Sequence, residues 1–185
     1  YTFTVGELGS QHTVVVSAQT GTYGTISKTI TLSPSAINLV WEADTTTPPF
    51  YRGRSLYSGG SKVTVVAYPQ VSLNKQAISP KALSYQWSLN DEPLQAASGL
   101  GKKTLVFQGD QLKKSEFVEL DVYAGSIKVG HKSVTIQAIN PLLVFYQRNP
   151  LRGEIFENAL GSSVSFSGPE LTVQAEPFFF ATNSK

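Results

Sequence analysis

Cysteine and methionine are both absent from this sequence of 185 residues. Without cysteine the chain has no disulfide bond, no thiol nucleophile and no thiolate metal site. Charged residues make up only 15% of the sequence and nearly balance to a net charge of +2, so the sequence lacks the broad basic surface of nucleic-acid-binding proteins. Its apolar runs are also shorter than the roughly 18 residues of a membrane-spanning helix. We therefore expect neither a nucleic-acid partner nor a transmembrane segment in this chain.

The sequence consists of short apolar runs, and its 15 glycines and 10 prolines separate these runs. The first residue is Tyr1, and neither a start methionine nor a signal peptide precedes the first apolar run. We expect the sequence to be a processed mature chain or an excerpt from a longer one.

Several segments of the sequence recur at one spacing. KTITL begins at Lys28, and the similar KSVTI begins at Lys132, which is 104 residues later. LVW at Leu39 and LVF at Leu143 are separated by the same 104 residues, whereas VTVVAYP and LTVQAEP are 108 residues apart, as a four-residue insertion would explain. Matched spacing across unrelated intervening sequence predicts an internal repeat of about 104 residues.

The repeated segments share an alternation of apolar and polar residues, which is the pattern of a strand with one buried face. In VELDVYA, Val118, Leu120 and Val122 alternate with polar or amphipathic residues, and Val14 and Val16 occupy the matching positions in the earlier copy. We predict that such alternating residues, together with a tryptophan, form the core. The predicted core residues are Val63, Val65, Trp87, Val118, Leu120, Val122, Val134 and Ile136.

A module of about 100 residues built from short alternating strands, with turn signals every 8–12 residues or so, is typical of a β-sandwich. The segment SYQWSLNDEPLQAASGLGKKTLVFQGD places Tyr85, Trp87 and Leu89 on one strand face and follows them with an Asn90-Asp91 turn. It resembles the Trp-bearing C strand of an immunoglobulin-like domain and the hairpin after it. The strands FVELDVYAG and KSVTIQA then stand in the places of strands F and G. The resemblance is closest to the Cys-free immunoglobulin-like and PKD-like repeats of bacterial surface proteins, and it implies an all-β sandwich without the B–F disulfide of antibody domains.

The resemblance also implies a domain organisation. Residues 35–138 resemble one complete immunoglobulin-like module. Residues 1–34, which include YTFTV, HTVVVSA and KTITLSP, resemble the C-terminal strands of a preceding module, and residues 139–185 resemble the N-terminal strands of a following one. We therefore expect a window of a tandem array of similar modules.

The loop TTTPPFYRGR contains the candidate binding residues Phe50, Tyr51, Arg52 and Arg54. The preceding prolines stiffen the loop because each proline fixes its own φ angle. Aromatic rings beside guanidinium groups are favoured at binding surfaces, and rings also stack on sugars. The other interpretation is that the rings cover the end of the sandwich or pack on a neighbouring module. The partial recurrence of this loop as NPLRGEIF favours packing.

Signatures of catalysis or metal binding are weak in this sequence. The two histidines, His12 and His131, are expected at strand entries, and no G-x-S-x-G nucleophile elbow accompanies them. SGLGKKT lacks the spacing of a phosphate-binding loop, and the acidic pairs at 42–44 and 91–92 lack the alternating pattern of a calcium loop. We predict a protein that is not an enzyme and that holds neither a cofactor nor a metal.

These expectations lead to a functional hypothesis. The leading hypothesis is a structural or display module in the tandem immunoglobulin-like stalk of a bacterial cell-surface or secreted protein, whose partners are the neighbouring modules. Adhesion to other surface proteins or to glycans through the aromatic and arginine loop is the first alternative. The second is a filament subunit that assembles by strand complementation.

Overall fold

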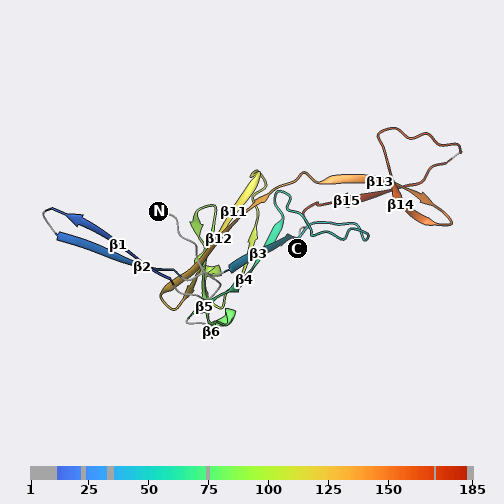
Figure 1. Cartoon of the computed structure of the whole chain (residues 1–185). Coiled ribbons are helices and arrows are strands. Elements are labelled where there is room, and N and C mark those ends of the chain that lie inside the picture. Colours follow the sequence, from blue (N-terminus) through green and yellow to red (C-terminus); the bar gives the residue numbers. More distant parts are fainter. Residues whose placement is uncertain (1–11, 22–23, 33–35, 74–75, 169, 183–185) are drawn as a thin grey trace. The chain divides into compact units, whose positions relative to one another are not determined.

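The computed structural model describes residues 12–21, 24–32, 36–73, 76–168 and 170–182, and this part of the chain is all-β (Figure 1). Its strands are β1 (His12–Thr20), β2 (Gly24–Leu32), β3 (Ala36–Ala43), β4 (Lys62–Gln70), β5 (Ser72–Leu73), β6 (Gln76–Ala77), β7 (Ser84–Leu89), β8 (Glu92–Pro93), β9 (Gly99–Leu100), β10 (Thr104–Gln108), β11 (Ser115–Ala124), β12 (Ile127–Gln137), β13 (Leu142–Asn149), β14 (Gly153–Leu160) and β15 (Val173–Phe178). The helices described are two 3₁₀ turns, η1 (Pro80–Ala82) and η2 (Gln95–Ala97). The prediction of an all-β chain is confirmed.

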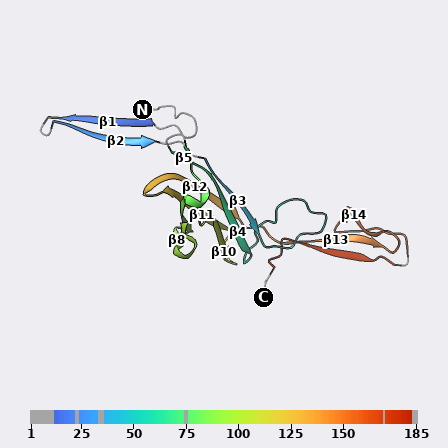
Figure 2. The same cartoon turned by 90° about the horizontal axis from the view of Figure 1, so that it is seen from below.

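The strands join into several separate sheets. One sheet has the order β10-β4-β3, and a second has the order β12-β11-β7-β8, with β9 also paired to β7. A third sheet has the order β14-β13-β15, while β1 pairs with β2 and β5 pairs with β6. Figure 2 shows the β1–β2 hairpin and the strands β13 and β14.

Alternating burial places the core on one face of each of the first two sheets. On β4, Val63, Val65 and Ala67 have no exposed surface, and the residues between them are half-buried. On β11, Val118, Leu120 and Val122 are equally inaccessible, as a period of two residues requires. Of the other residues predicted for the core, Trp87 and Ile136 are buried, whereas Val134 on β12 is half-buried.

Two large rings on β7 have their polar atoms satisfied inside the protein. The indole Nε1 of Trp87 donates a hydrogen bond to the Lys102 carbonyl oxygen at 2.9 Å. The hydroxyl of Tyr85 donates one to the Pro80 carbonyl at 2.9 Å. Because a buried polar atom without a partner costs about 1–3 kcal/mol, these bonds allow both rings to lie in the core.

The hairpin after β7 turns at Asn90 and Asp91, as its sequence predicts. Leu89 and Glu92 are paired across it, so the loop contains two residues. Both loop residues have positive φ angles, 52° for Asn90 and 68° for Asp91. Two consecutive positive φ angles are the geometry of a type I′ turn, which fits the right-handed twist of the paired strands.

The chain divides into two compact units. The first unit contains residues 1–40, 65–105 and 117–135, and the second contains residues 41–64, 106–116 and 136–185. The boundaries of the predicted modules, at 34/35 and 138/139, stay a prediction. The predicted strand YTFTV lies outside the described residues.

Candidate functional site

The loop between β3 and β4 carries the binding residues proposed from the sequence, and in the second unit its rings join an aromatic cluster. The ring of Phe50 lies 4.5 Å from that of Phe156 and 5.7 Å from that of Tyr146, measured between centroids. The ring of Phe178 is 6.2 Å from Phe50. These residues come from β14, β13 and β15, so Phe50 packs on all three strands of this sheet. Edge-to-face ring pairs contribute about 0.5–1.5 kcal/mol each beyond the area they bury.

Tyr51 extends the same cluster toward the end of β15. Its ring lies 5.4 Å from that of Phe179 and 6.2 Å from that of Phe178, both in edge-to-face geometry. The Tyr51 hydroxyl donates to the Arg54 carbonyl at 3.2 Å, which closes the loop on itself. A Cβ at Gly53 would lie 2.5 Å from this hydroxyl oxygen, so the glycine leaves the space that the tyrosine occupies.

Backbone hydrogen bonds reinforce the aromatic contacts. The Thr46 amide donates to the Phe180 carbonyl at 2.8 Å, and the Phe179 amide donates to the Thr46 carbonyl at 2.6 Å. Thr45 and Ala181 form an antiparallel bridge beside them. We call residues 44–53, with these contacts, the clasp.

The two arginines proposed for binding lie outside the ring cluster. The guanidinium carbon of Arg54 stacks 3.8 Å from the ring centroid of Trp41, and Arg52 is exposed. Phe50 keeps 38% of its surface exposed, although its ring contacts three others. In the structure the rings of Phe50 and Tyr51 therefore contact other rings, while Arg54 makes a separate stacking contact with Trp41.

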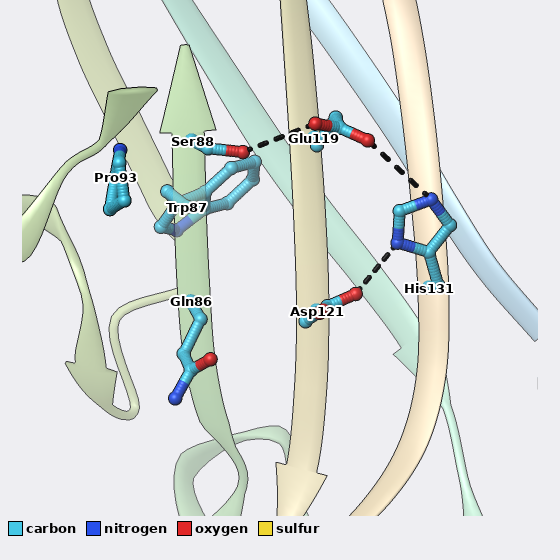
Figure 3. Close-up of a pocket in the computed structure, with 7 residues that line it drawn as sticks. All are labelled: Gln86, Trp87, Ser88, Pro93, Glu119, Asp121 and His131. Carbon is cyan, nitrogen blue, oxygen red and sulfur yellow. Dashed lines mark hydrogen bonds and ion pairs between the residues drawn. The ribbon is translucent and has the colours of Figure 1, made fainter. Parts of the chain in front are cut away.

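A second candidate site lies on the first unit, in a shallow pocket on the sheet β12-β11-β7-β8 (Figure 3). The lining residues are Gln86, Trp87, Ser88, Pro93, Glu119, Asp121 and His131. The sequence places His131 at a strand entry, but it lies within β12, which begins at Ile127. Its Nδ1 is 2.6 Å from Asp121 Oδ1, and its Nε2 is 3.9 Å from Glu119 Oε1.

The charges of this pocket are paired with one another. Lys128 Nζ lies 2.7 Å from Asp121 Oδ1, on the carboxylate that also contacts His131. Burial works to raise the pKa of Asp121, but the hydrogen bonds and charges of Lys128 and His131 outweigh it and hold this pKa below its usual value. Such half-exposed ion pairs contribute about 0–1 kcal/mol each.

In the same pocket the serine hydroxyl and the histidine ring lie on opposite sides of Glu119. The hydroxyl of Ser88 contacts Glu119 Oε2 at 3.5 Å, on the side away from His131 (Figure 3). The histidine contacts Asp121 and Glu119, and Lys128 pairs with Asp121, so the arrangement is a polar network between adjacent strands. Within the described ranges, no group of three or more histidine, aspartate or glutamate side chains is placed to hold a metal ion.

A buried polar pair in the second unit was not anticipated from the sequence. The Tyr57 hydroxyl lies 3.1 Å from Glu116 Oε1, and the Asp110 amide donates to the same oxygen at 2.8 Å. Burial first, and then the negative charges of Glu116 and Asp110, raise the pKa of Tyr57. Glu116 precedes Val118 and Leu120 at a spacing of two, and this period was a signal that it faces inward.

Comparison with models of known protein families, with curated proteins and with solved structures finds no match for this chain. In the part of the chain that the structure describes, no helix has the length and apolar character needed to cross a bilayer.

Proposed function

We propose that this chain is part of a tandem array of immunoglobulin-like sandwiches with a structural or display role. The observation that carries the proposal is the recurrence of whole strand pairs. Moved 104 positions along the chain, β1 and β2 coincide with β11 and β12 to within one residue at each end. The first two strands form a hairpin, and the second two are neighbours in their sheet.

A second pair of strands supports the same repeat. β3 moved by 104 positions falls within two residues of β13, and β4 moved by 108 ends with β15 at residue 178. β3 is the neighbour of β4 in one sheet, and β13 is the neighbour of β15 in another. A one-residue slip would turn every core side chain to the wrong face, so matched pairing is expected of repeated modules.

The strand order of the central segment supports the immunoglobulin-like assignment. In that fold strands A, B and E share one sheet, and strands C, F and G share the other. If β3, β4 and β10 are A, B and E, the observed order β10-β4-β3 is E-B-A. The order β12-β11-β7 then corresponds to G-F-C, with Trp87 on strand C.

The clasp supports a structural role for the aromatic loop. Under the proposed organisation, Phe50 belongs to the central module, and its ring partners Tyr146, Phe156 and Phe178 belong to the next one. Such a junction would limit hinge motion between successive modules. We place this array on a bacterial cell surface or in a secreted protein, with its neighbouring modules as partners and no catalytic activity of its own.

The array makes a mechanical prediction that force spectroscopy of the full chain can test. The central module should unfold as one unit and release about 104 residues, which corresponds to roughly 350 Å of extended chain. Trp87→Ala should lower the force at which this module unfolds, because the indole is 1% exposed and fills the core. Val15→Ala should leave this unfolding force unchanged, because Val15 is 59% exposed on β1. A force–extension curve without an unfolding step of this length would contradict the proposal.

Adhesion to glycans through Phe50, Tyr51, Arg52 and Arg54 is the alternative function. It needs ring faces that are free to stack on sugars, whereas the rings of Phe50 and Tyr51 already contact others. A glycan array comparing the wild type with Tyr51→Ala separates the two functions. Binding that disappears in the variant would favour adhesion, and the absence of binding would favour the structural role.

A further inference from the structure

Two neighbouring hollows on the first unit form one trough along β7. The pocket of Figure 3 has a volume of about 200 Å³, and a second hollow of about 540 Å³ adjoins it, since Gln86, Trp87 and Pro93 line both. Gln95 and Ser98 add to the border of the second hollow. Its volume falls in the range of roughly 300–1,000 Å³ that is usual for ligand sites. The trough is therefore large enough to hold a small ligand.

Polar side chains form the floor of the trough, on the outer face of the sheet. In the register of β7 and β11, Glu119 pairs with Ser88. Two positions along each strand, Asp121 pairs with Gln86. Trp87 lies between the two β7 residues in sequence and is buried, so these four side chains point away from the core. Directly paired side chains are about 5 Å apart, and the floor thus presents a hydroxyl, an amide and two carboxylates within reach of one ligand.

A break in the alternation of β12 brings a lysine to one of these carboxylates. Lys128 and His131 are three positions apart, so strict alternation would turn them to opposite faces, yet both contact Asp121. Val129 and Ile136 are seven positions apart and both are buried, which requires the same break. Such a break is typical of a β-bulge, and bulges re-aim side chains beside functional sites. Asp121 thus has two close basic partners.

The carboxylate of Glu119 is held less closely. Its Oε2 lies 3.5 Å from Ser88 Oγ, and its Oε1 lies 3.9 Å from His131 Nε2. Both distances exceed the usual hydrogen-bond length of about 2.7–2.9 Å. A hydroxyl group of a ligand beside each oxygen would donate to the carboxylate at normal length. Two hydroxyl groups on neighbouring carbon atoms match the two oxygens of one carboxylate.

We propose that this trough binds a neutral saccharide through Glu119 and Gln86. Neighbouring hydroxyls of a sugar ring donate to the two oxygens of Glu119, and the Gln86 amide exchanges hydrogen bonds with a further hydroxyl. The ring of Pro93 borders both hollows and offers an apolar surface to the C–H groups of the sugar. The charges of Asp121 and Lys128 offset each other, so a neutral ligand suits this floor better than an anion. The site goes beyond the proposed display role and does not depend on the repeat.

The position of the trough favours a ligand over a neighbouring module or a peptide strand. Gln86 and Asp121 lie inside their strands, whereas successive modules of the proposed array join at strand ends, through segments such as 138–141. A peptide that extends a sheet needs the backbone groups of an edge strand. β7 is not an edge strand, since β11 lies on one side of it and β8 and β9 pair on the other.

Nuclear magnetic resonance titration of the full, ¹⁵N-labelled chain tests the site. The probes are maltotriose, cellotriose, laminaritriose and chitotriose, each added to about 20 mM, so that dissociation constants in the millimolar range are measurable. With at least one probe, the amides of β7 and of residues 119–121 should shift until saturation. Glu119→Gln should weaken this binding about 10-fold to 150-fold, the factor expected for the loss of hydrogen bonds to a charged group. Glu157→Gln, at an exposed position of β14 in the second unit, is the matched control and should bind as wild type.

Two further measurements separate this site from other modes of binding. Tyr51→Ala should bind the sugar as wild type does, because Tyr51 belongs to the loop of the second unit. A tetra-arginine peptide tests whether Glu119 instead takes a cation. Shifts in β7 with this peptide but with none of the sugars would overturn the proposal.

The saccharide site is also overturned if none of the four sugars shifts the amides of β7, or if Glu119→Gln binds as tightly as wild type. Binding that Tyr51→Ala abolishes would place the sugar on the loop of the second unit and overturn the trough as its site. The amide spectrum of Glu119→Gln without sugar checks that the variant keeps the wild-type fold. The length of the force-unfolding step is independent of all these results, so the proposed function is tested separately.

Discussion

The hydroxyl of Tyr57 and the carboxylate of Glu116 lie 3.1 Å apart in the second unit, with 0% and 1% of the two residues exposed. The same hydroxyl is 3.1 Å from the Asp110 carbonyl oxygen, and the Asp110 amide donates to Glu116 Oε1, the oxygen that the hydroxyl contacts. The pair thus joins the loop before β4 to the start of β11. Polar groups this deep in a sheet protein stabilise the fold only while each keeps its partner.

Stability should fall in alkaline solution because of buried tyrosines. Burial raises the pKa of both Tyr57 and Tyr85 above 10, the value expected in the unfolded chain. A raised pKa means that this stability is present below pH 10 and is lost as pH rises toward the folded-state pKa. Above pH 10 the unfolded chain releases the protons first, so the free energy of unfolding should drop by up to about 1.4 kcal/mol per pH unit for each tyrosine.

Urea unfolding between pH 8 and pH 11.5, followed by tryptophan fluorescence, measures this slope. Tyr57→Phe should make the slope shallower, and it should also cost about 1–2 kcal/mol at pH 7 because the Glu116 carboxylate loses a donor. Tyr85→Phe should also make the slope shallower. The variant with both substitutions should lose the contributions of both tyrosines to the slope. A slope that Tyr57→Phe leaves unchanged would show that this tyrosine ionises equally in the folded and unfolded chains.

Gly109 makes room for the ring of Tyr57. A Cβ at this position would lie 2.4 Å from both Cε2 and the hydroxyl oxygen of Tyr57, too close for the ring to stay in place. Gly109→Ala should therefore destabilise the fold by about 1–3 kcal/mol, the usual cost of overpacking. Gly161→Ala is the matched control, since the nearest atom to its new Cβ would be 3.9 Å away. Equal melting temperatures for the two variants would contradict the prediction.

Much of the architecture could be read from the sequence because it depends on a short-range signal. The period of two residues in VELDVYA is sufficient to place Val118, Leu120 and Val122 on one face, and all three are buried. The Asn90-Asp91 turn is similarly local, since both residue types tolerate positive φ. Burial of Val134 was overestimated because alternation identifies a face but not how completely that face is covered.

The sites depended on contacts between distant residues, and these were harder to predict. Phe50 and Phe156 are 106 positions apart, and their contact could be expected only as packing on an unspecified neighbour. The run KSVTI, which begins after His131, predicts a strand entry there, whereas β12 extends back to Ile127. The pairing of His131 with Asp121 follows from the register of β11 and β12, which the separate patterns of the two strands do not specify.

Asp91 offers a position where a substitution should stabilise the protein. Its φ of 68° is unfavourable for any residue with a Cβ, and glycine adopts it without strain. Asp91→Gly should raise the free energy of unfolding by about 0.5–1 kcal/mol, because Asn-Gly is a preferred pair for a type I′ turn. Asn90→Gly is the control. Asn90 Oδ1 accepts a hydrogen bond from the Phe117 amide at 3.0 Å, and the loss of this bond should cancel the stability gained by placing glycine at a positive φ. Urea unfolding of both variants measures the difference, and a less stable Asp91→Gly protein would contradict it.

The clasp should hold the sheet β14-β13-β15 in place, and Phe50→Ala tests this. The variant removes the ring that contacts Tyr146, Phe156 and Phe178, and a half-exposed ring of this kind contributes about 1–3 kcal/mol. Opening of β13 and β15 should therefore require less free energy. Their amides should exchange with solvent roughly 5-fold to 150-fold faster, since about 1.4 kcal/mol corresponds to a factor of ten.

The location of the faster exchange distinguishes this role from a general loss of stability. Amides of β7 and of residues 117–124 of β11, which belong to the first unit, should keep their wild-type protection, because the Phe50 ring contacts described above are made within the second unit. Arg52→Ala is the matched control in the same loop: Arg52 is exposed, and its removal should leave exchange unchanged throughout. If Phe50→Ala accelerated exchange equally in β11 and β15, the ring would be stabilising the chain as a whole. If Phe50→Ala accelerated exchange in neither strand, the ring would not stabilise the sheet β14-β13-β15. The exposed part of Phe50 would then again become a candidate for binding.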